Sequence, residues 1–231
     1  MNSNRKRVIA VGDVHGCNKT LQALLFDRIK LKKTDTVILI GDLVDRGPDS
    51  KGVLDTIMNL QSEGYTGVRC LLGNHEDMLL QAIRTGDEYD LQFWQENGGD
   101  EALESFGVKL PQQMPEEYIS FLKGLKLYYQ TTTHVFVHAG LNFSLDKPLS
   151  KKGRDSMLWE RRVKVEPDKI GERKLVTGHT IMALNLIAES LESNLIQLDN
   201  GCFMGKRFKG KGSLVALDVN NGELFVQENI E

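Results

Sequence analysis

A strand pattern that ends in Gly-Asp is the feature that most constrains how this chain can fold. Residues 36–40 are mostly apolar and of strand length, and Gly41-Asp42 follow them directly, with Asp45 and Arg46 a few positions later. A carboxylate just beyond a strand is well placed to hold a metal ion, and an arginine close behind it can bind an anion such as phosphate. A single Gly-Asp pair is usually only a turn, so the argument depends on its recurrence.

The same pattern recurs where other predicted strands end. The predicted strands are residues 7–11, 36–40, 68–72, 133–137 and 174–177, and the side chains that follow them are Asp13, His15, Asp42, Asn74, His138 and His179. Helices are predicted between the first strands, two of them capped by Asn18 and Asp49 and a third at residues 77–84. Strands that alternate with helices predict an α/β core with parallel strands, in which ligands bind beyond the carboxyl ends.

The middle and the tail of the chain depart from this alternation. Residues 87–123 are predicted to form an amphipathic helical insertion, broken at Gly98-Gly99 and Pro111, with Phe93 and Trp94 in the core. The tail is predicted to be an antiparallel meander, with a tight hairpin turn at Asn221-Gly222 and strands at residues 186–189, 194–198 and 214–219. Because no internal repeat or linker is evident, we predict one domain, residues 1–231.

Composition narrows the class of protein. The 231 residues, of which 40% are hydrophobic and 26% charged, suit one globular domain with a sizeable core, and a net charge of -3 argues against a general nucleic-acid or membrane binder. Cys17, Cys70 and Cys202 are too few and too scattered for a disulfide framework, so we predict that they are buried and reduced. The apolar stretch after the basic start breaks at Gly12-Asp13, too early for a signal peptide, and no apolar run could span a membrane. We therefore predict a cytoplasmic protein.

The side chains at the strand ends have the composition of a metal site. Two carboxylates, one amide and three imidazoles, without thiolate, suit manganese, iron or zinc better than calcium or copper(I). Taken singly, each could be a turn former, a helix cap or a core histidine, but five strand ends of this kind favour the metal site. Six donors exceed the need of one catalytic metal, whereas two metals sharing a carboxylate would use them all. Paired metals roughly 3.5–4 Å apart clamp the attacking and leaving oxygens of a phosphoryl transfer.

These segments resemble the ordered signature of the calcineurin-like metallophosphoesterases and, within them, the bacterial and phage form of the phosphoprotein phosphatase family. The resemblance is carried by Gly12-Asp13-Val14-His15-Gly16, Gly41-Asp42-Leu43-Val44-Asp45-Arg46-Gly47, Gly73-Asn74-His75-Glu76, His138-Ala139-Gly140 and Gly178-His179-Thr180. It implies a four-layer α/β/β/α sandwich of two mixed sheets flanked by helices. It also implies a hydrolase of phosphoric esters with two divalent metal ions, manganese first and iron or zinc as alternatives, in which a hydroxide bridging the metals attacks phosphorus directly.

The resemblance implies a role for each residue. Asp13, His15 and Asp42 would hold the first metal, and Asp42, Asn74, His138 and His179 the second. His75 would be the general acid for the leaving alkoxide, oriented by Asp45, and this suits the chemistry because an adjacent carboxylate favours the charged imidazole. Arg46 would bind the phosphate together with a second arginine after Trp159, where Arg161 fits the phage-type spacing better than Arg162. Asn97-Gly98-Gly99 also resembles a feature of the bacterial group, with no role assigned.

The sequence leaves the substrate open between two classes. Asp45 and Glu76 favour a phosphatase for phosphoserine and phosphothreonine, because the symmetrical diadenosine tetraphosphate hydrolases typically lack the first acid and carry Asp in place of the second. Leu72, Ala139 and Gly47-Pro48 point to those hydrolases instead. A third alternative, nucleic-acid binding by the basic segment 205–211, is less favoured than a solvated loop. The predicted partners are a phosphorylated protein or a small phosphoester, with no nucleic acid and no membrane.

Overall fold

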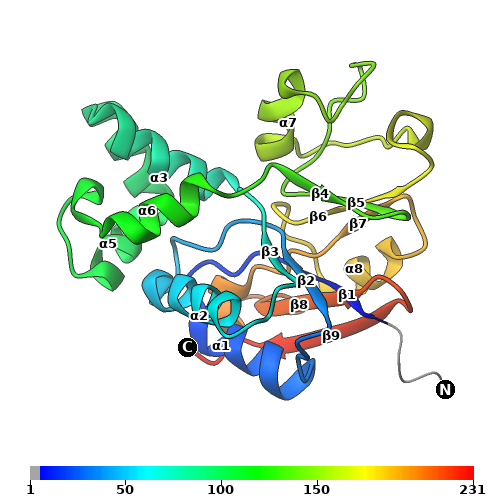
Figure 1. The fold of residues 1–231 in the computed structure, drawn as a ribbon, viewed down its shortest axis with the longest axis horizontal. Coiled ribbons are helices and arrows are strands. Elements are labelled where there is room, and N and C mark those ends of the chain that lie inside the picture. The colour runs from blue at the N-terminus through cyan, green and yellow to red at the C-terminus, as the bar shows by residue number, and fades with distance from the viewer. Residues whose placement is uncertain (1–5) are drawn as a thin grey trace.

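The structure, a computed structural model, describes residues 6–231 and contains two mixed β-sheets (Figure 1). The first sheet has the order β3-β2-β1-β8-β9, formed by Val68–Cys70, Thr36–Leu39, Val8–Val11, Ser213–Asp218 and Glu223–Glu228. The second has the order β4-β5-β6-β7, formed by Tyr128–Gln130, His134–Val137, Lys174–Thr177 and Leu195–Gln197. Strands β1, β2 and β3 are parallel, as are β5, β6 and β7, whereas β4, β8 and β9 join antiparallel. The predicted pair of mixed sheets is confirmed.

Alternate residues of each central strand face two different apolar layers. Ile38 of β2 packs with Phe136 of β5 and Val176 of β6 in a buried cluster between the sheets. Val37 and Leu39 point to the opposite face and join the cluster beneath the helices. Because successive side chains of a strand point to opposite faces, burial on both sides explains why this strand reads as a continuous apolar run.

Helices cover the outer faces of the sheets and complete the four layers (Figure 1). The first sheet carries α1 (Asn18–Gln22), which continues as the π-helical segment Ala23–Arg28, and α2 (Ser50–Ser62). The second sheet carries α7 (Arg154–Trp159) on its outer face and contacts α8 (Leu184–Ser190) at β7. A helical lobe projects to the left in Figure 1 and comprises α3 (Asn74–Thr85), α4 (Glu88–Trp94), α5 (Asp100–Phe106) and α6 (Glu116–Lys123). Short 3₁₀ segments lie at Pro111–Gln113, Lys151–Gly153, Pro167–Ile170 and Cys202–Arg207.

The tail of the chain differs from the predicted antiparallel meander. Residues 186–189 belong to α8 rather than to a strand, and β7 joins the second sheet parallel to β6. Strands β8 and β9 do form the hairpin predicted at Asn221-Gly222, but in the first sheet. A short apolar run can form either a helix or a strand, and its pattern alone does not distinguish them. Here the run forms a helix that buries Ile187 between the sheets.

Two predictions about single residues are also wrong. Asn18 is the first residue of α1 rather than its cap, and its amide Nδ2 instead donates to Asp49 Oδ2 at 2.8 Å. Asp49 caps α2 as predicted, because its side chain accepts from the backbone N–H of Gly52. Phe93 is 41% exposed rather than core, whereas Trp94 is fully buried as predicted.

Three further features concern the chain as a whole. Cys17, Cys70 and Cys202 are buried and free, as predicted. No helix among residues 6–231 is long and apolar enough to cross a membrane. The first five residues of the basic start lie outside the described part, and the single domain, residues 1–231, stays a prediction.

Candidate metal centre and active site

The predicted metal ligands gather where strands of both sheets end. The register pairs Val11 with Leu39 and Leu39 with Cys70, so the loops after β1, β2 and β3 leave the same edge of the first sheet. In the second sheet, Gly178 N donates to His138 O at 2.8 Å and joins the loops after β5 and β6. This arrangement brings together six buried side chains, Asp13, His15, Asp42, Asn74, His138 and His179.

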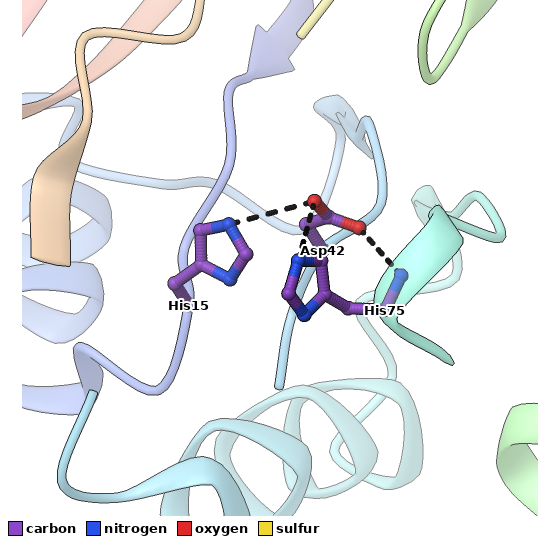
Figure 2. Close-up of side chains that lie close together, drawn as sticks. All are labelled: His15, Asp42 and His75. Carbon is purple, nitrogen blue, oxygen red and sulfur yellow. Dashed lines mark hydrogen bonds and ion pairs between the residues drawn. The ribbon is translucent and has the colours of Figure 1, made fainter. Parts of the chain in front are cut away.

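The donor atoms form two clusters that share Asp42. One cluster contains His15, Asp42 and His75, the other contains Asp42, His138 and His179, and within each cluster the possible ligand atoms lie within 4.8 Å of one another. Asp42 Oδ2 is 3.4 Å from His15 Nε2, and Asp42 Oδ1 is 3.4 Å from His138 Nε2. Figure 2 shows the imidazoles of His15 and His75 both facing the same oxygen of the Asp42 carboxylate, Oδ2. One carboxylate therefore reaches both clusters.

The hydrogen bonds of the histidines leave lone pairs directed at the centre. His15 Nδ1 is 3.0 Å from Val44 O and His138 Nδ1 is 2.9 Å from Ile40 O, so each ring donates from Nδ1 and keeps a lone pair on Nε2. Burial lowers the pKa of His138 and His179 to about 3, which keeps both imidazoles neutral at pH 7. Neutral imidazole is the form that binds metal ions.

The second cluster fits a divalent cation. His138 Nε2 lies 2.8 Å from Asn74 Oδ1 and 3.2 Å from His179 Nδ1. Because Nδ1 of His138 donates to the carbonyl of Ile40, its Nε2 carries a lone pair. Nε2 and Asn74 Oδ1 are therefore two acceptors in contact, and a cation bound to both would stabilise this arrangement. Oxygen and nitrogen donors without sulfur suit manganese, iron or zinc.

Asp13 lies beside these clusters and faces a backbone amide. Its two carboxylate oxygens accept from His179 N at 2.9 and 3.1 Å, and a Cβ at position 178 would lie 1.9 Å from Asp13 Oδ1, so Gly178 is required there. Burial, with the charges of Asp199 and Asp42, raises the pKa of Asp13 well above its usual value. Asp199 is a buried acid that the sequence reasoning missed, although it follows β7 in the same strand-then-acid pattern.

The backbone is strained at the candidate site. Non-glycine residues with positive φ include five residues from the predicted motifs: His15, Asp42, Asp45, Arg46 and His179, with φ between 46° and 71°. Such conformations cost free energy and persist only when the surrounding structure holds them, and they tend to cluster at functional sites.

His75 and Asp45 form the predicted pair. His75 Nδ1 lies 2.9 Å from Asp45 Oδ2, and His75 Nε2 lies 3.9 Å from Asp42 Oδ2, facing the centre. The predicted effect of Asp45 on the imidazole is outweighed, because burial, followed by the charges of His15 and Arg46, lowers the pKa of His75 well below its usual value. Burial likewise raises the pKa of Asp45. The pairing is therefore present, while burial of the ring disfavours the charged imidazole.

The two predicted arginines lie at one cavity. A cavity of about 350 Å³ is lined by Asp42, Asn74, His75 and His179, together with Arg46 and Arg161. Helix α7 ends at Trp159, so Arg161 and Arg162 lie beyond it in a segment without regular secondary structure, and the backbone N–H of Arg162 donates to Glu160 Oε1. Arg46 Nη1 is 3.0 Å from His15 Nε2, and its guanidinium lies over the ring of Phe203 at 4.8 Å. The Arg46 guanidinium therefore lies within hydrogen-bond distance of the His15 nitrogen that carries the lone pair.

Glu76 has a structural role that the sequence did not reveal. It is fully buried, and its carboxylate accepts four backbone N–H bonds, from Asp42, Leu43, Val44 and Gly73, at 2.6–3.2 Å. These bonds hold the loop that carries Asp42 against the start of α3. Glu76 therefore shapes the loop rather than the cavity, and its identity carries less information about the substrate than we expected.

Comparison with known proteins places this arrangement among phosphoesterases. The family model described as calcineurin-like phosphoesterase matches residues 6–190, which is most of the chain. The chain is 33% identical to serine/threonine-protein phosphatase 1 of Salmonella typhimurium over 171 residues, 68% of this chain and 70% of that protein. It is 32% identical to a symmetrical bis(5'-nucleosyl)-tetraphosphatase of Nitrosomonas europaea over 141 residues, 60% of this chain and 47% of that protein.

Other comparisons agree on the fold and are partial in length. A match at 39% identity to serine/threonine-protein phosphatase 2 of Escherichia coli spans 41% of this chain and only 39% of that protein. The structure of a protein serine/threonine phosphatase from Saccharomyces cerevisiae superposes with a TM-score of 0.68 at 15% identity, covering 100% of this chain and 82% of that chain. At that identity the likeness shows the fold alone.

Proposed function

The chain belongs to the calcineurin-like phosphoesterase family, and from this premise we propose that it is a metal-dependent phosphomonoesterase acting on phosphoserine and phosphothreonine in proteins. The family comprises phosphoesterase hydrolases with a dinuclear metal centre. The finer proposal rests on one observation, the buried contact of 2.9 Å between His75 Nδ1 and Asp45 Oδ2. A departing serine or threonine alkoxide needs a proton, and an imidazole oriented by a carboxylate is suited to supply it.

The metal ligands are proposed from the family resemblance, and the two donor clusters contain four of them, His15, Asp42, His138 and His179. Asp13, His15 and Asp42 would hold one divalent ion, and Asp42, Asn74, His138 and His179 the other, with manganese proposed ahead of iron or zinc. The bound pair would supply charge neutralisation of the phosphate and activation of water. The chain itself contributes neutral imidazoles and a carboxylate that reaches both clusters.

Arg46 and Arg161 are proposed to bind the phosphate oxygens, because a guanidinium matches them with two parallel donors. Arg161→Ala should lower kcat/KM roughly 10–100-fold, the size of a lost charge-assisted hydrogen bond, and should weaken inhibition by inorganic phosphate. Arg162→Ala is the matched control and should have a much smaller effect, because that side chain does not line the cavity. Steady-state kinetics on both variants decide this, and greater sensitivity at Arg162 would move the assignment by one residue.

A symmetrical diadenosine tetraphosphate hydrolase is the second candidate. It is favoured by the similarity to the Nitrosomonas europaea enzyme, since the chain resembles both kinds of relative to a comparable degree. Because Glu76 acts on the loop backbone, Asp45 is the residue that best separates the two functions. The group that leaves diadenosine tetraphosphate is a nucleotide, which departs through a phosphate oxygen and does not need the proton that an alkoxide needs. A phosphorylated protein or a small phosphoester is the proposed substrate, and the cytoplasmic location stays a prediction.

The two candidates differ in an expected kinetic ratio. The enzyme should turn over a phosphoserine or phosphothreonine peptide with a higher kcat/KM than diadenosine tetraphosphate, both measured at one manganese concentration. Asp45→Ala should impair peptide turnover more than dinucleotide cleavage, because only the peptide step relies on an oriented proton donor. A ratio that favours the dinucleotide by about tenfold or more, or about 1.4 kcal/mol of differential transition-state binding, would replace the first candidate by the second.

A further inference from the structure

The helical insertion reaches the candidate active site through the side chain of Trp94. The indole Nε1–H of Trp94 donates a hydrogen bond of 2.9 Å to Asp45 Oδ2, the same oxygen that lies 2.9 Å from His75 Nδ1. All three side chains are buried. An indole N–H can only donate, so Asp45 Oδ2 accepts from Trp94 on one side and from His75 on the other.

The two glycines that follow Trp94 hold the adjacent loop. The backbone N–H of Arg46 donates to Gly98 O at 2.9 Å, and a Cβ at Gly98 would lie 2.7 Å from the Arg46 side chain. Gly99 lies against the indole, where a Cβ would be 2.5 Å from the ring of Trp94. Asp45 and Arg46 have φ of 71° and 68°, which non-glycine residues adopt only where the surroundings hold them. The segment from Trp94 to Gly99 is part of those surroundings.

We propose that Trp94 is a positioning residue for the proton donor: its indole N–H holds Asp45 in the orientation that directs His75 Nε2 at the leaving group. The inference rests on the proposed function, because it requires His75 to act as the general acid. It also gives a role to the Asn97-Gly98-Gly99 segment, because Gly98 lets the Arg46 backbone pack closely against this segment and Gly99 does the same for the Trp94 indole.

The hydrogen bonding of Asp45 explains why one donor matters. Asp45 Oδ1 is buried and has no hydrogen-bond partner among the described residues, so Oδ2 alone accepts from Trp94 and His75. Without the indole N–H, nothing favours Oδ2 over Oδ1 opposite His75, and the terminal torsion of a carboxylate is soft. The imidazole would then lose its fixed partner, and misplacement of a catalytic group lowers turnover more than binding.

Trp94→Phe removes the donor while retaining an aromatic side chain. The ratio of kcat on a phosphoserine peptide to kcat on p-nitrophenyl phosphate should fall about tenfold, since only the poor leaving group needs the proton. KM and metal content should stay unchanged. Tyr118→Phe is the matched control. Tyr118 also lies in the insertion, and its hydroxyl donates to Asp55 Oδ1 of α2 at 2.6 Å, so the substitution removes one hydrogen bond and should leave the ratio unchanged. An unchanged ratio in a folded Trp94→Phe enzyme overturns the proposal.

A second measurement does not depend on the Trp94 variant folding. The chain has 2 tryptophans, so an amide–nitrogen NMR spectrum contains two indole N–H signals. Asp45→Asn should move the Trp94 signal upfield and leave that of Trp159 in place, and no movement would overturn the proposed contact. His75→Asn separates the two levels of argument. If His75→Asn lowers the turnover of alkyl and aryl esters equally, the general-acid function of His75 is rejected. If His75→Asn lowers mainly alkyl-ester turnover while Trp94→Phe leaves the ratio unchanged, only the role of Trp94 is rejected.

Discussion

Asp42→Asn is expected to reduce phosphatase activity by more than about 10²-fold, because even residues that only orient metal ligands typically cost 10–100-fold when replaced. Asp42 is the one side chain present in both donor clusters, with one oxygen 3.4 Å from His15 Nε2 and the other 3.4 Å from His138 Nε2. The substitution removes a charge from both proposed metal sites at once. Steady-state kinetics and metal analysis of the purified variant measure the two consequences separately.

Metal removal gives the matching result on the unmodified enzyme. Chelation should abolish activity, and manganese should be among the best ions for restoring it. The control for Asp42→Asn is Asp27→Asn, which changes an exposed aspartate of the outer helical layer and should retain both activity and bound metal. Metal analysis that finds at most one ion per chain in fully active enzyme would contradict the two-metal proposal.

His75→Asn is expected to lower kcat by roughly 10²–10⁴, the usual contribution of general acid–base catalysis. His75 Nε2 faces the centre without a hydrogen-bond partner among the described residues, while Nδ1 is fixed by Asp45. The loss should shrink for aryl phosphates, whose leaving groups need less protonation. Kinetics on a matched pair of alkyl and aryl esters measure this difference.

A second histidine serves as the control for this substitution. His134→Asn changes a buried imidazole at the start of β5, where the ring contacts Thr133 Oγ1 rather than the metal centre. It should leave the ratio of alkyl to aryl turnover unchanged. His75→Asn should also leave metal content nearly unchanged. A large loss of bound metal in that variant would indicate that His75, which belongs to one donor cluster, acts as a ligand instead.

The strand-end motifs were readable from the sequence because their physics is local. An apolar run followed by Gly-Asp, Gly-Asn or a histidine marks a buried strand and the loop after it, and parallel strands place such loops on one edge. The structure accordingly brings Asp42, Asn74 and His138 together. The secondary structure of the tail was predicted less accurately. Residues 184–190 and 195–197 are short apolar runs, and whether each forms a helix or a strand, and which strand it pairs with, depends on the sheet it packs against.

By itself, the sequence indicated the α/β class and the set of polar side chains at the strand ends, since both depend on residue type and on position after a strand. The pairing of His75 with Asp45 came from the resemblance to a known family. Only the tertiary structure decided that Arg161 rather than Arg162 lines the cavity, that Glu76 anchors four backbone amides, and that Trp94 reaches Asp45. These features join segments far apart in the chain, as the 49 residues between Asp45 and Trp94 show, and no local periodicity encodes them. They depend on how the insertion and the loops pack over the sheet edge, which is settled only when the whole core is formed.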